Sequence, residues 1–416
     1  MMNLAIVGLQ WGDEGKGKIV DYLAKDFDIN ARYQGGSNAG HTVRFGREKM
    51  IFHQVPCGVL NKQVLGIIGG GCVLDPRVIL AEIESLKKYD PVIESRVKVS
   101  RFCHLIMPYH IKLDEYREGT KQAIGTTRRG IGLAYEDKYG RTGIRLGDLY
   151  NTESFGKKLS LNISRKNLVL MDVYNAEPLS DNEIFDRYMG YAGKLRPMVA
   201  DDTRILGDAI SAGKNILFEG AQGAMLDIDF GTYPYVTSSH TISSSVGIGL
   251  GIPPYNVESV LGVVKAYTTR VGQGPFPTED SGQLGALLRD SGAEFGSTTG
   301  RPRRCGPFDA ALVRYAARIN GAREIIMTKL DVLSGIDSLK IATTYEACAE
   351  FDPFASGSLV PKYMKVPGFR QDISAARSPE DLPGAARDYL KAVEEHTGLK
   401  IAYVSVGPER DAIIRM

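Results

Sequence analysis

A glycine-rich loop near the start of the chain constrains the fold more than any other feature. The loop, Gly8–Lys18, follows the apolar run Leu4–Val7, which predicts a buried strand, and precedes Ile19–Leu23, which predicts a helix. A turn of this kind places backbone N–H groups at the positive end of a helix dipole, where phosphate oxygens bind. The chain is therefore expected to bind phosphate groups in its first strand–helix loop.

The spacing within this loop matches that of nucleotide-binding loops up to its last position. Gly12, Gly17 and Lys18 follow the pattern, but Ile19 stands where Ser or Thr normally supplies a hydroxyl group to magnesium. Another oxygen must therefore hold a metal ion here, and Asp13 within the loop is the predicted ligand. An acid beside bound phosphates can also take part in the chemistry.

Short apolar runs alternate with helical patterns along the chain, which predicts an α/β fold with a large, mainly parallel central sheet flanked by helices. The first loop makes this sheet similar to that of P-loop NTPases. Strands are expected at Leu4–Val7, Val64–Ile68, Asn215–Phe218, Val260–Tyr267, Glu324–Thr328 and Ile401–Val406, and the clearest helices at Asp309–Asn320 and Ala385–His396. Residues 1–416 are expected to form a single domain, with a helical insertion at about 105–210.

Ligands of such sheets bind beyond the carboxyl ends of the strands. The loops that follow the first, third, fourth, fifth and sixth of these predicted strands are therefore expected to converge.

The composition argues against several other classes of protein. Lys plus Arg number 51 and Asp plus Glu 49, so the net charge of +2 gives no electrostatic basis for binding nucleic acid or an anionic membrane. No apolar run approaches the length that spans a membrane. The five cysteines are scattered without metal-type spacing, which is typical of a reducing compartment. We expect a cytoplasmic protein with no nucleic-acid or membrane partner.

A second glycine-rich loop, Gln34–Thr42, contains His41 directly after Gly40. Its glycines allow the backbone to approach a ligand closely. A lone histidine is more often structural, but the density of glycine favours a functional role for His41. The other histidines have no comparable setting and are interpreted as structural.

The sequence Thr-Lys-Leu-Asp at Thr328–Asp331 lies at the end of a predicted strand. In GTP-binding proteins a Lys-x-Asp sequence at this place reads guanine, because the carboxylate accepts hydrogen bonds from the ring N–H and the exocyclic amine. Alone, the tripeptide is a weak signal, and a solvated loop is the simpler interpretation. Combined with a phosphate loop, it indicates GTP.

A basic loop at Gly296–Arg304 places three arginines within four residues, next to small hydroxyl residues. Arginine binds carboxylates and phosphates through paired hydrogen bonds, although a solvated surface loop is an equally good interpretation of these residues alone. Asp227 and Asp229 likewise fit either a carboxylate pair or a structural role. The sequence suggests no Ser-His-Asp or Cys-His nucleophile and no zinc spacing.

Several long motifs together resemble those of the adenylosuccinate synthetase family over nearly the whole chain. They are Gln10–Lys18, Gly35–His41, Gly125–Gly132, Glu219–Gly223 with Gly231–Ser239, the basic loop and Ser405–Arg410. The resemblance implies a ligase of purine and AMP biosynthesis that joins IMP to L-aspartate with GTP. Adenylosuccinate, GDP and phosphate would form through a 6-phosphoryl-IMP intermediate. A homodimer with one Mg²⁺ per subunit is also implied.

By this resemblance, Asp13 is the general base that takes the N1 proton of IMP, and His41 is the acid that stabilises charge on the phosphoryl group. Asp13 and the carbonyl oxygen of Gly40 would hold Mg²⁺, which accounts for the missing hydroxyl at Ile19. A carboxylate within a phosphate loop and a cationic histidine suit these roles chemically.

The resemblance also implies binding residues, position by position. Those for IMP are Asp13, Glu14, Gly15, Lys16, Asn38, Ala39, Gly40, His41, Thr127, Gln222, Thr237 and Arg301, with Arg141 reaching the IMP of the neighbouring subunit. Those for GTP are Gly12, Asp13, Glu14, Gly15, Lys16, Gly17, Lys18, Gly40, His41, Thr42, Arg303, Lys329, Leu330, Asp331, Ser405, Val406 and Gly407. Those for aspartate are Ser297, Thr298, Thr299, Gly300, Arg301, Pro302 and Arg303, in a loop expected to be mobile until ligands bind.

The sequence departs from the family pattern at Leu133, Pro302, Cys305–Phe308 and His240–Ser245, none of which is an implied catalytic residue.

Other functions explain fewer of these features. A non-catalytic GTP switch would account for the phosphate loop and the Lys-x-Asp sequence, but not for Asp13, the Gly40–His41 pair or the basic loop. A relative that acts on a 2-amino purine nucleotide would replace Asp13. A degraded homologue would not retain both Asp13 and His41.

Overall fold

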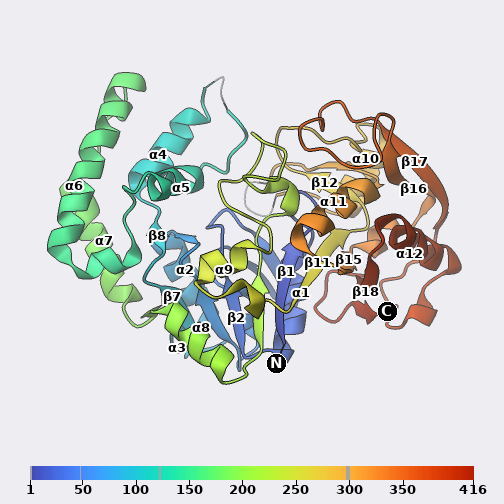
Figure 1. Ribbon diagram of the computed structural model, residues 1–416, viewed down its shortest axis with the longest axis horizontal. Coiled ribbons are helices and arrows are strands. Elements are labelled where there is room, and N and C mark those ends of the chain that lie inside the picture. Colours follow the sequence, from blue (N-terminus) through green and yellow to red (C-terminus); the bar gives the residue numbers. More distant parts are fainter. Residues whose placement is uncertain (1, 47, 121–122, 297–299) are drawn as a thin grey trace.

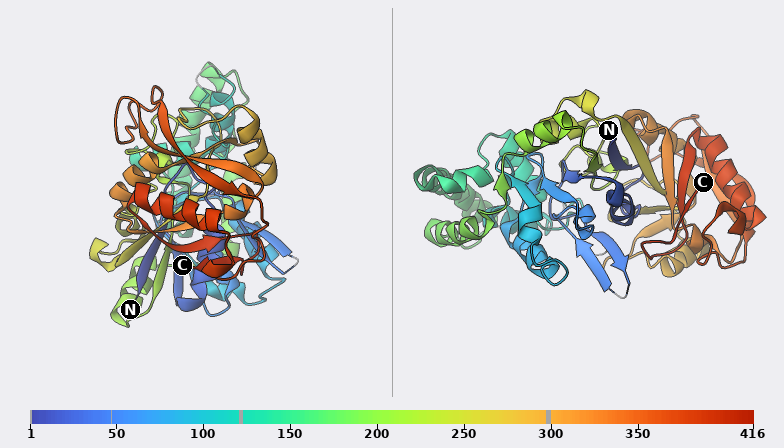
Figure 2. Two further views of the ribbon diagram at one scale, coloured as in Figure 1. Left: turned by 90° about the vertical axis from the view of Figure 1, so that its right-hand side faces the viewer. Right: turned by 90° about the horizontal axis from the view of Figure 1, so that it is seen from below.

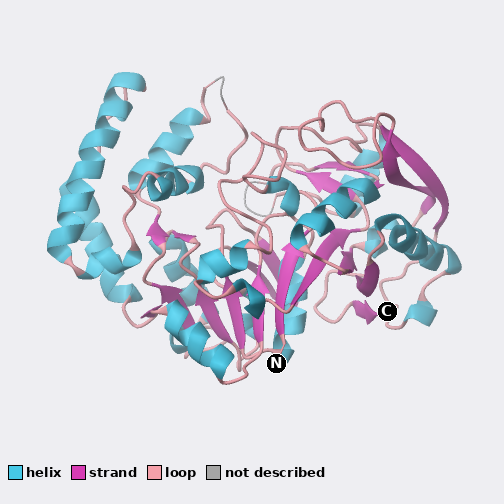
Figure 3. Ribbon diagram, in the orientation of Figure 1, coloured by secondary structure: helices cyan, strands magenta, loops and turns pink. Residues whose placement is uncertain are grey.

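A ten-stranded sheet runs through the centre of the protein in the computed structural model, which describes residues 2–46, 48–120, 123–296 and 300–416 (Figures 1 and 3). From one edge to the other, the strands are β19 (Ile413–Arg415), β18 (Lys400–Ser405), β15 (Glu324–Thr328), β11 (Ser259–Lys265), β1 (Asn3–Gly8), β10 (Ile216–Glu219), β2 (Ile29–Arg32), β5 (Leu65–Ile68), β7 (Val97–Ser100) and β9 (Val199–Ala200). Neighbouring strands are parallel except for the antiparallel pair of β18 and β19.

This sheet confirms the predicted fold class. Each of the six predicted strands corresponds to one of its strands, with bounds that agree within two residues. The parallel arrangement places the carboxyl ends of these strands at one edge, and loops gather above that edge in Figure 3.

Helices cover both faces of the sheet. They are α1 (Lys16–Leu23), α2 (Pro76–Leu86), α3 (Ile93–Arg96), α4 (Pro108–Arg117), α5 (Ile131–Tyr139), α6 (Thr152–Leu168), α7 (Asp181–Leu195), α8 (Asp202–Ser211), α9 (Ser245–Leu250), α10 (Gln283–Ser291), α11 (Ala310–Asn320) and α12 (Gly384–Thr397). Successive side chains of β1 point to opposite faces. Ile6 packs in a cluster with Ile19 of α1, whereas Val7 belongs to a cluster with Leu312 of α11. The view from below in Figure 2 shows α2 and α8 on opposite sides of the sheet.

Helix α11 begins and ends at the residues that its sequence predicts. The side chain of Asp309 accepts a hydrogen bond from the backbone N–H of Leu312 (3.0 Å), and Gly321 follows the helix with φ 66°. Helix α12 likewise ends before Gly398, which has φ 69°. Both helix predictions are confirmed.

Residues 105–211 contain α4 to α8, and α6 and α7 form one end of the molecule, opposite α12 (Figure 1). The smaller sheets pair β3 (His41–Phe45) with β4 (Glu48–Phe52), β6 (Val73–Leu74) with β8 (His104–Leu105), β12 (Thr268–Arg270) with β13 (Arg304–Gly306), and β16 (Ile336–Tyr345) with both β14 (Phe308–Asp309) and β17 (Pro361–Phe369). Among the described residues, no helix combines the length and apolar character needed to cross a membrane.

Candidate active site

The phosphate loop contacts the loops that follow neighbouring strands of the sheet. Gln10 Nε2 donates to the carbonyl oxygen of Tyr267 after β11 (3.1 Å). The carbonyl oxygen of Gln10 accepts from the N–H of Met225 after β10 (3.1 Å). Thr328 Oγ1, at the end of β15, donates to the carbonyl oxygen of Glu14 (2.6 Å). The predicted convergence of these loops at the carboxyl edge of the sheet is confirmed.

The N-terminus of α1 is built to receive an anion. Gly15 precedes the helix with φ 90°, and within the described chain no side chain caps it. Backbone N–H groups there are left for an external acceptor, as phosphate binding requires. His41 packs directly against Gly17, where a larger residue would not fit. A Cβ on Gly17 would lie 2.6 Å from the Cβ of His41. The phosphate loop and the second glycine-rich loop, Gln34–Thr42, are therefore in contact at Gly17 and His41.

The side chain of Glu14 stabilises the phosphate loop through contacts within the loop. Its buried carboxylate accepts from the N–H groups of Gln10 (3.1 Å) and Gly12 (2.8 Å). Lys16 Nζ lies 2.5 Å from the other carboxylate oxygen. The side chain of Glu14 is thus occupied by the loop itself, which leaves its backbone to contact a ligand.

Lys18 joins α1 to the loop after β18. Its Nζ donates to Ser405 Oγ (2.8 Å) and to the carbonyl oxygens of Gly407 (2.8 Å) and Ala412 (3.0 Å). Burial lowers the pKa of Lys18 to about 8. The motif spacing predicts that the Lys18 ammonium group binds phosphate. In the structure it instead holds residues 405–407 beside the phosphate loop.

Left-handed backbone conformations are concentrated at predicted site residues. In the part of the chain that the structure describes, the non-glycine residues with positive φ are Asp13, Arg128, Arg141, Asn175, Gln222, Ala293 and Lys329, with φ between 47° and 60°. Four of these seven are predicted site residues: Asp13, Arg141, Gln222 and Lys329. Such conformations cost about 1–3 kcal/mol each and persist where the surrounding structure imposes them, commonly at functional sites.

His41 is held by a buried carboxylate that the sequence analysis did not assign. Its Nδ1 lies 2.7 Å from Glu219 Oε1 at the end of β10. Burial lowers the pKa of His41 despite the opposing charge of Glu219, and the pKa of Glu219 is itself lowered, because the His41 ring and Arg32 outweigh its burial. The contact engages Nδ1 and leaves Nε2 as the ring nitrogen for a ligand.

Cys57 completes this cluster, with its Sγ 3.5 Å from His41 Nδ1 and 3.3 Å from Glu219 Oε1. The three side chains are close enough to share a metal ion. However, burial and the Glu219 carboxylate raise the pKa of the Cys57 thiol well above its usual value. In this structure the N–H and the thiol of Cys57 donate to the two carboxylate oxygens of Glu219, so the cluster is hydrogen-bonded.

Replacing Glu219 by Gln is expected to lower kcat about 10- to 100-fold with little change in KM, because the imidazolium form predicted for His41 would lose the charge that stabilises it. The pKa of His41 would fall further, so the loss of activity with rising pH would begin at a lower pH. Steady-state kinetics across pH checks both effects. The matched control is Glu153→Gln on α6, where the glutamate is exposed and pairs with Lys157. An unchanged kcat and pH profile for Glu219→Gln would contradict the role of this carboxylate.

The predicted guanine-reading residues lie in the loop after β15. Asp331 Oδ1 is buried and has no hydrogen-bond partner in the described parts of the chain. Burial raises the pKa of Asp331, although Lys329 and Lys18 oppose this. A buried acceptor without a partner is costly, and a ligand that brings N–H donors would satisfy it.

Arg303 stands between two carboxylates from different segments. Its Nε lies 2.9 Å from Asp13 Oδ2, and its Nη1 donates to the buried Glu294. Arg303 is therefore brought to the phosphate loop, as the GTP assignment requires.

The main chain of Pro302 forms an antiparallel bridge with Phe295.

Arg301 connects the basic loop to the loop that contains Thr127. It donates to the carbonyl oxygens of Gly125 (3.3 Å) and Thr126 (3.5 Å). Three residues predicted to bind aspartate, Ser297, Thr298 and Thr299, lie outside the described residues.

The remaining residues predicted to bind IMP divide into two groups. Gln222 Nε2 donates to Asn38 Oδ1 (3.2 Å), and the buried Oε1 of Gln222 has no partner among the described residues. Thr237 donates through its N–H to the carbonyl oxygen of Leu226 (2.9 Å), on the segment after β10. Arg141, by contrast, is exposed just beyond the end of α5.

The positions that depart from the family pattern are occupied by packing and surface contacts. Leu133 is buried with Leu113 in a small cluster, and Cys305 lies in the main core. His240 Nδ1 lies 3.1 Å from Asp229 Oδ2 and its Nε2 lies 3.3 Å from the hydroxyl of Tyr139.

The side chain of Asp227 accepts hydrogen bonds from nearby backbone N–H groups. Its Oδ1 accepts from the N–H of Asp229 (3.0 Å), and its Oδ2 accepts from the N–H of Thr241 (2.6 Å). These contacts favour the structural interpretation of the Asp227 and Asp229 pair.

Sequence reasoning missed two buried carboxylates at the site, Glu219 and Glu294. Glu219 carries a signal, since it ends the otherwise apolar strand β10. Glu294 carries none, because no local pattern indicates that Lys265, Arg303 and Lys329 pack around it.

The comparisons with known proteins agree with each other. A family model described as adenylosuccinate synthetase matches residues 5–414. Proteins named adenylosuccinate synthetase from Carboxydothermus hydrogenoformans and Moorella thermoacetica are each 49% identical over 422 residues, which cover 100% of this chain and 99% of each relative. The solved structure of fully ligated adenylosuccinate synthetase from Plasmodium falciparum is 39% identical, with a TM-score of 0.94 and 100% of both chains covered. Cyanophage S-2L succinoaminodeoxyadenylate synthetase, 21% identical with a TM-score of 0.65, shares the fold.

The fold and the site define an α/β enzyme in which an acid, a histidine and arginines gather around a phosphate loop at the carboxyl edge of the sheet. The chain belongs to the adenylosuccinate synthetase family. It is a ligase of AMP biosynthesis that joins IMP to L-aspartate in a GTP-dependent reaction. These comparisons do not favour a non-catalytic GTP switch.

Proposed function

We propose that the ligation proceeds in two steps around the phosphate loop, with Asp13 as general base and His41 as general acid. Asp13 takes the proton from N1 of IMP, and the 6-oxygen attacks the γ-phosphate of GTP, releasing GDP. The amine of aspartate then displaces phosphate from 6-phosphoryl-IMP to give adenylosuccinate. The contact between Asp13 and Arg303 supports this proposal, because a carboxylate and a guanidinium group lie together at the loop.

His41 would stabilise the phosphoryl group as it transfers. Its Nε2 remains for the ligand because Nδ1 is engaged by Glu219. The negative charge of bound phosphates would raise the pKa of His41, which burial holds low in their absence. The imidazolium would therefore form when the nucleotides are in place.

The binding residues implied by the family motifs are proposed with the same roles. IMP would be held from the loops at 13–16, 38–41, Thr127, Gln222, Thr237 and Arg301. GTP would be held from 12–18, 40–42, Arg303, 329–331 and 405–407. The loop at 297–303 would bind the carboxylates of aspartate.

Asp13 and Gly40 would hold one Mg²⁺ per subunit. The donor set fits this ion, since the Asp13 carboxylate is partly exposed (32%) and a backbone carbonyl is the second hard oxygen ligand. Ile19 offers no hydroxyl and is fully buried. Bound there, the ion would neutralise charge on the phosphate groups.

We also infer a cytoplasmic homodimer, in which each 416-residue chain is one domain with an insertion at about 105–210. Arg141 would reach the IMP of the neighbouring subunit, which agrees with its exposure at the end of α5. Asp13→Ala and Arg141→Ala should each be inactive alone. A mixture of the two should recover about a quarter of wild-type activity, because each mixed dimer has one site free of both changes. A mixture that stays inactive while mixed dimers form would contradict sharing of Arg141.

The direct test of the reaction is product formation from IMP, L-aspartate, GTP and Mg²⁺, followed by chromatography with each component omitted in turn. Adenylosuccinate is expected only from the complete mixture. Hydrolysis of GTP without adenylosuccinate would contradict the proposed acceptor and direct attention to Pro302 and His240.

A further inference from the structure

Glu294 is buried two residues before the basic loop, and its carboxylate is contacted by donors from three separate parts of the chain. Its carboxylate lies 2.9 Å from Lys265 Nζ, 2.7 Å from Lys329 Nζ and 2.5 Å from the hydroxyl of Tyr267, and it accepts a further hydrogen bond from Arg303 Nη1. The side chain of Glu294 is 0% exposed. One carboxylate thus faces three cations, two of which are proposed to bind GTP at opposite ends.

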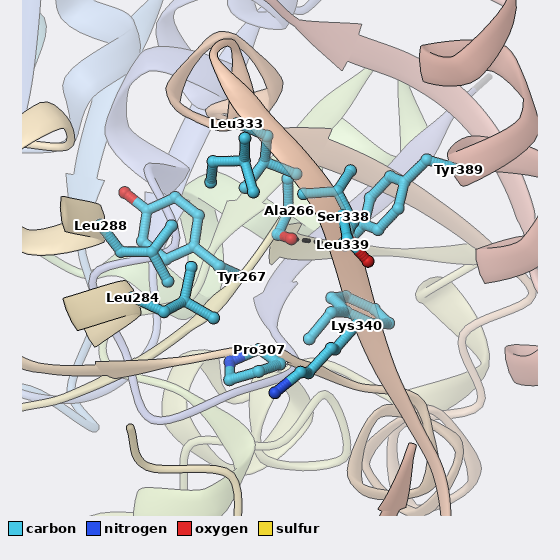
Figure 4. Close-up of a pocket in the computed structure, with 12 residues that line it drawn as sticks. Ala266, Tyr267, Leu284, Leu288, Pro307, Leu333, Ser338, Leu339, Lys340 and Tyr389 are labelled. Atoms are coloured by element: carbon cyan, nitrogen blue, oxygen red, sulfur yellow. Dashed lines mark hydrogen bonds between the residues drawn. The ribbon is translucent and has the colours of Figure 1, made fainter. Parts of the chain in front are cut away.

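Local structure holds Glu294 in this place. Ala293 before it has φ 47°, a conformation that a residue with a side chain rarely adopts. The carbonyl oxygen of Glu294 accepts from the N–H of Arg303 (2.9 Å), so its main chain and side chain bind the same arginine. The ring of Tyr267 lines a small pocket with Leu284 of α10 (Figure 4), and its hydroxyl donates to Glu294.

The charges around Glu294 differ in exposure. The cations hold the pKa of Glu294 well below its usual value although burial opposes them, so the group stays ionised. The side chain of Lys265 is 0% exposed, and burial lowers its pKa to about 8. Lys329, by contrast, is 31% exposed. Lys265 therefore compensates the buried charge. Lys329 keeps part of its side chain exposed, and Arg303, 9% exposed, extends from Glu294 to Asp13 of the phosphate loop.

We propose that Glu294 is a positioning residue for GTP, which sets the orientation of Lys329 at the guanine end and of Arg303 at the phosphate end before the nucleotide binds. This rests on the proposed function, in which those two cations contact GTP. Cations that are already ordered bind a nucleotide without the entropic cost of fixing long side chains. A single carboxylate would in this way link the basic loop to the loop after β15, which contains Lys329 and Asp331.

Two variants test this role by different chemistry. Glu294→Gln keeps the size of the side chain and removes its charge, whereas Glu294→Asp keeps the charge and withdraws it by one methylene. Each is expected to raise the KM for GTP about 10- to 100-fold, with the KM for IMP and kcat within about threefold of wild type. Calorimetric binding of GDP without IMP should weaken by a similar factor. The control is Glu279→Gln, which removes the partly exposed carboxylate partner of Arg304 and should change neither quantity.

The outcomes separate this proposal from the site assignment. A KM for GTP within about twofold of wild type in both Glu294 variants, or an equal rise in the KM values for all substrates, would overturn the positioning role. If Lys329→Met raises the KM for GTP and the Glu294 variants do not, only the role of Glu294 fails. If Lys329→Met also has no effect, the assignment of GTP fails with it. Should Glu294→Gln not fold, Glu294→Asp and Tyr267→Phe carry the same test.

Discussion

Replacing Asp13 by Asn is expected to lower kcat for adenylosuccinate formation by at least about 10³-fold. The amide has nearly the same size but cannot take the N1 proton of IMP, and it is a poorer ligand for Mg²⁺ than a carboxylate. The ion pair between Asp13 and Arg303 is lost as well. Product formation by chromatography measures the effect, and circular dichroism with the thermal midpoint establishes that the variant is folded.

The matched control for this variant is Asp208→Asn. Asp208 lies on α8 with its side chain 78% exposed and a long contact of 3.8 Å to Arg204. It should retain wild-type kcat, since exposed ion pairs contribute little. If Asp13→Asn keeps more than about a tenth of the wild-type kcat, Asp13 is not the general base.

Six strands of the ten-stranded sheet follow from apolar runs in the sequence, whereas β2, β7, β9 and β19 do not, and β2 shows one physical reason. Asn30 and Arg32 interrupt its four residues, yet both are buried. Asn30 Oδ1 accepts from the N–H of Gly58 (2.8 Å), and Arg32 donates to the carbonyl oxygen of His53 (2.5 Å). Arg32 Nε and Nη2 are buried without a partner among the described residues. A short strand that buries polar side chains shows no hydrophobic pattern that identifies it.

The site divides in the same way between local and distant information. Asp13, His41 and Asp331 stand out because each lies in a short loop whose composition indicates a ligand. The destination of the Lys18 ammonium could not be predicted, because its acceptors at residues 405, 407 and 412 are nearly 400 positions away in the sequence. Glu294 could not be predicted either, although its partners are only 9 to 35 positions away, because they meet it only where the loops pack. Motif spacing locates a backbone turn, whereas side-chain partners depend on how the loops pack.

Replacing Asp331 by Asn is expected to change which nucleotide drives the reaction. The carboxylate would accept from both N1–H and the 2-amino group of guanine, and its Oδ1 has no partner among the described residues. An amide can accept only one of these bonds and presents its own donor to the other. The KM for GTP should therefore rise about 100-fold, since a hydrogen bond to a charged group contributes about 1.5–3 kcal/mol. XTP, whose 2-oxygen accepts from an amide, should become the better substrate of the variant.

The pH dependence provides a second, independent sign of the same contact. Burial raises the pKa of Asp331, so its protonation begins at a higher pH than for an exposed aspartate. Because only the ionised form accepts both guanine donors, the KM for GTP in the wild type should rise as the pH falls through this pKa. The Asn variant has no titrating group here and should lack this dependence.

An unchanged order of preference among GTP, XTP and ATP in Asp331→Asn would show that guanine is read elsewhere. A change in preference together with loss of the pH effect would locate the reading of guanine at this carboxylate.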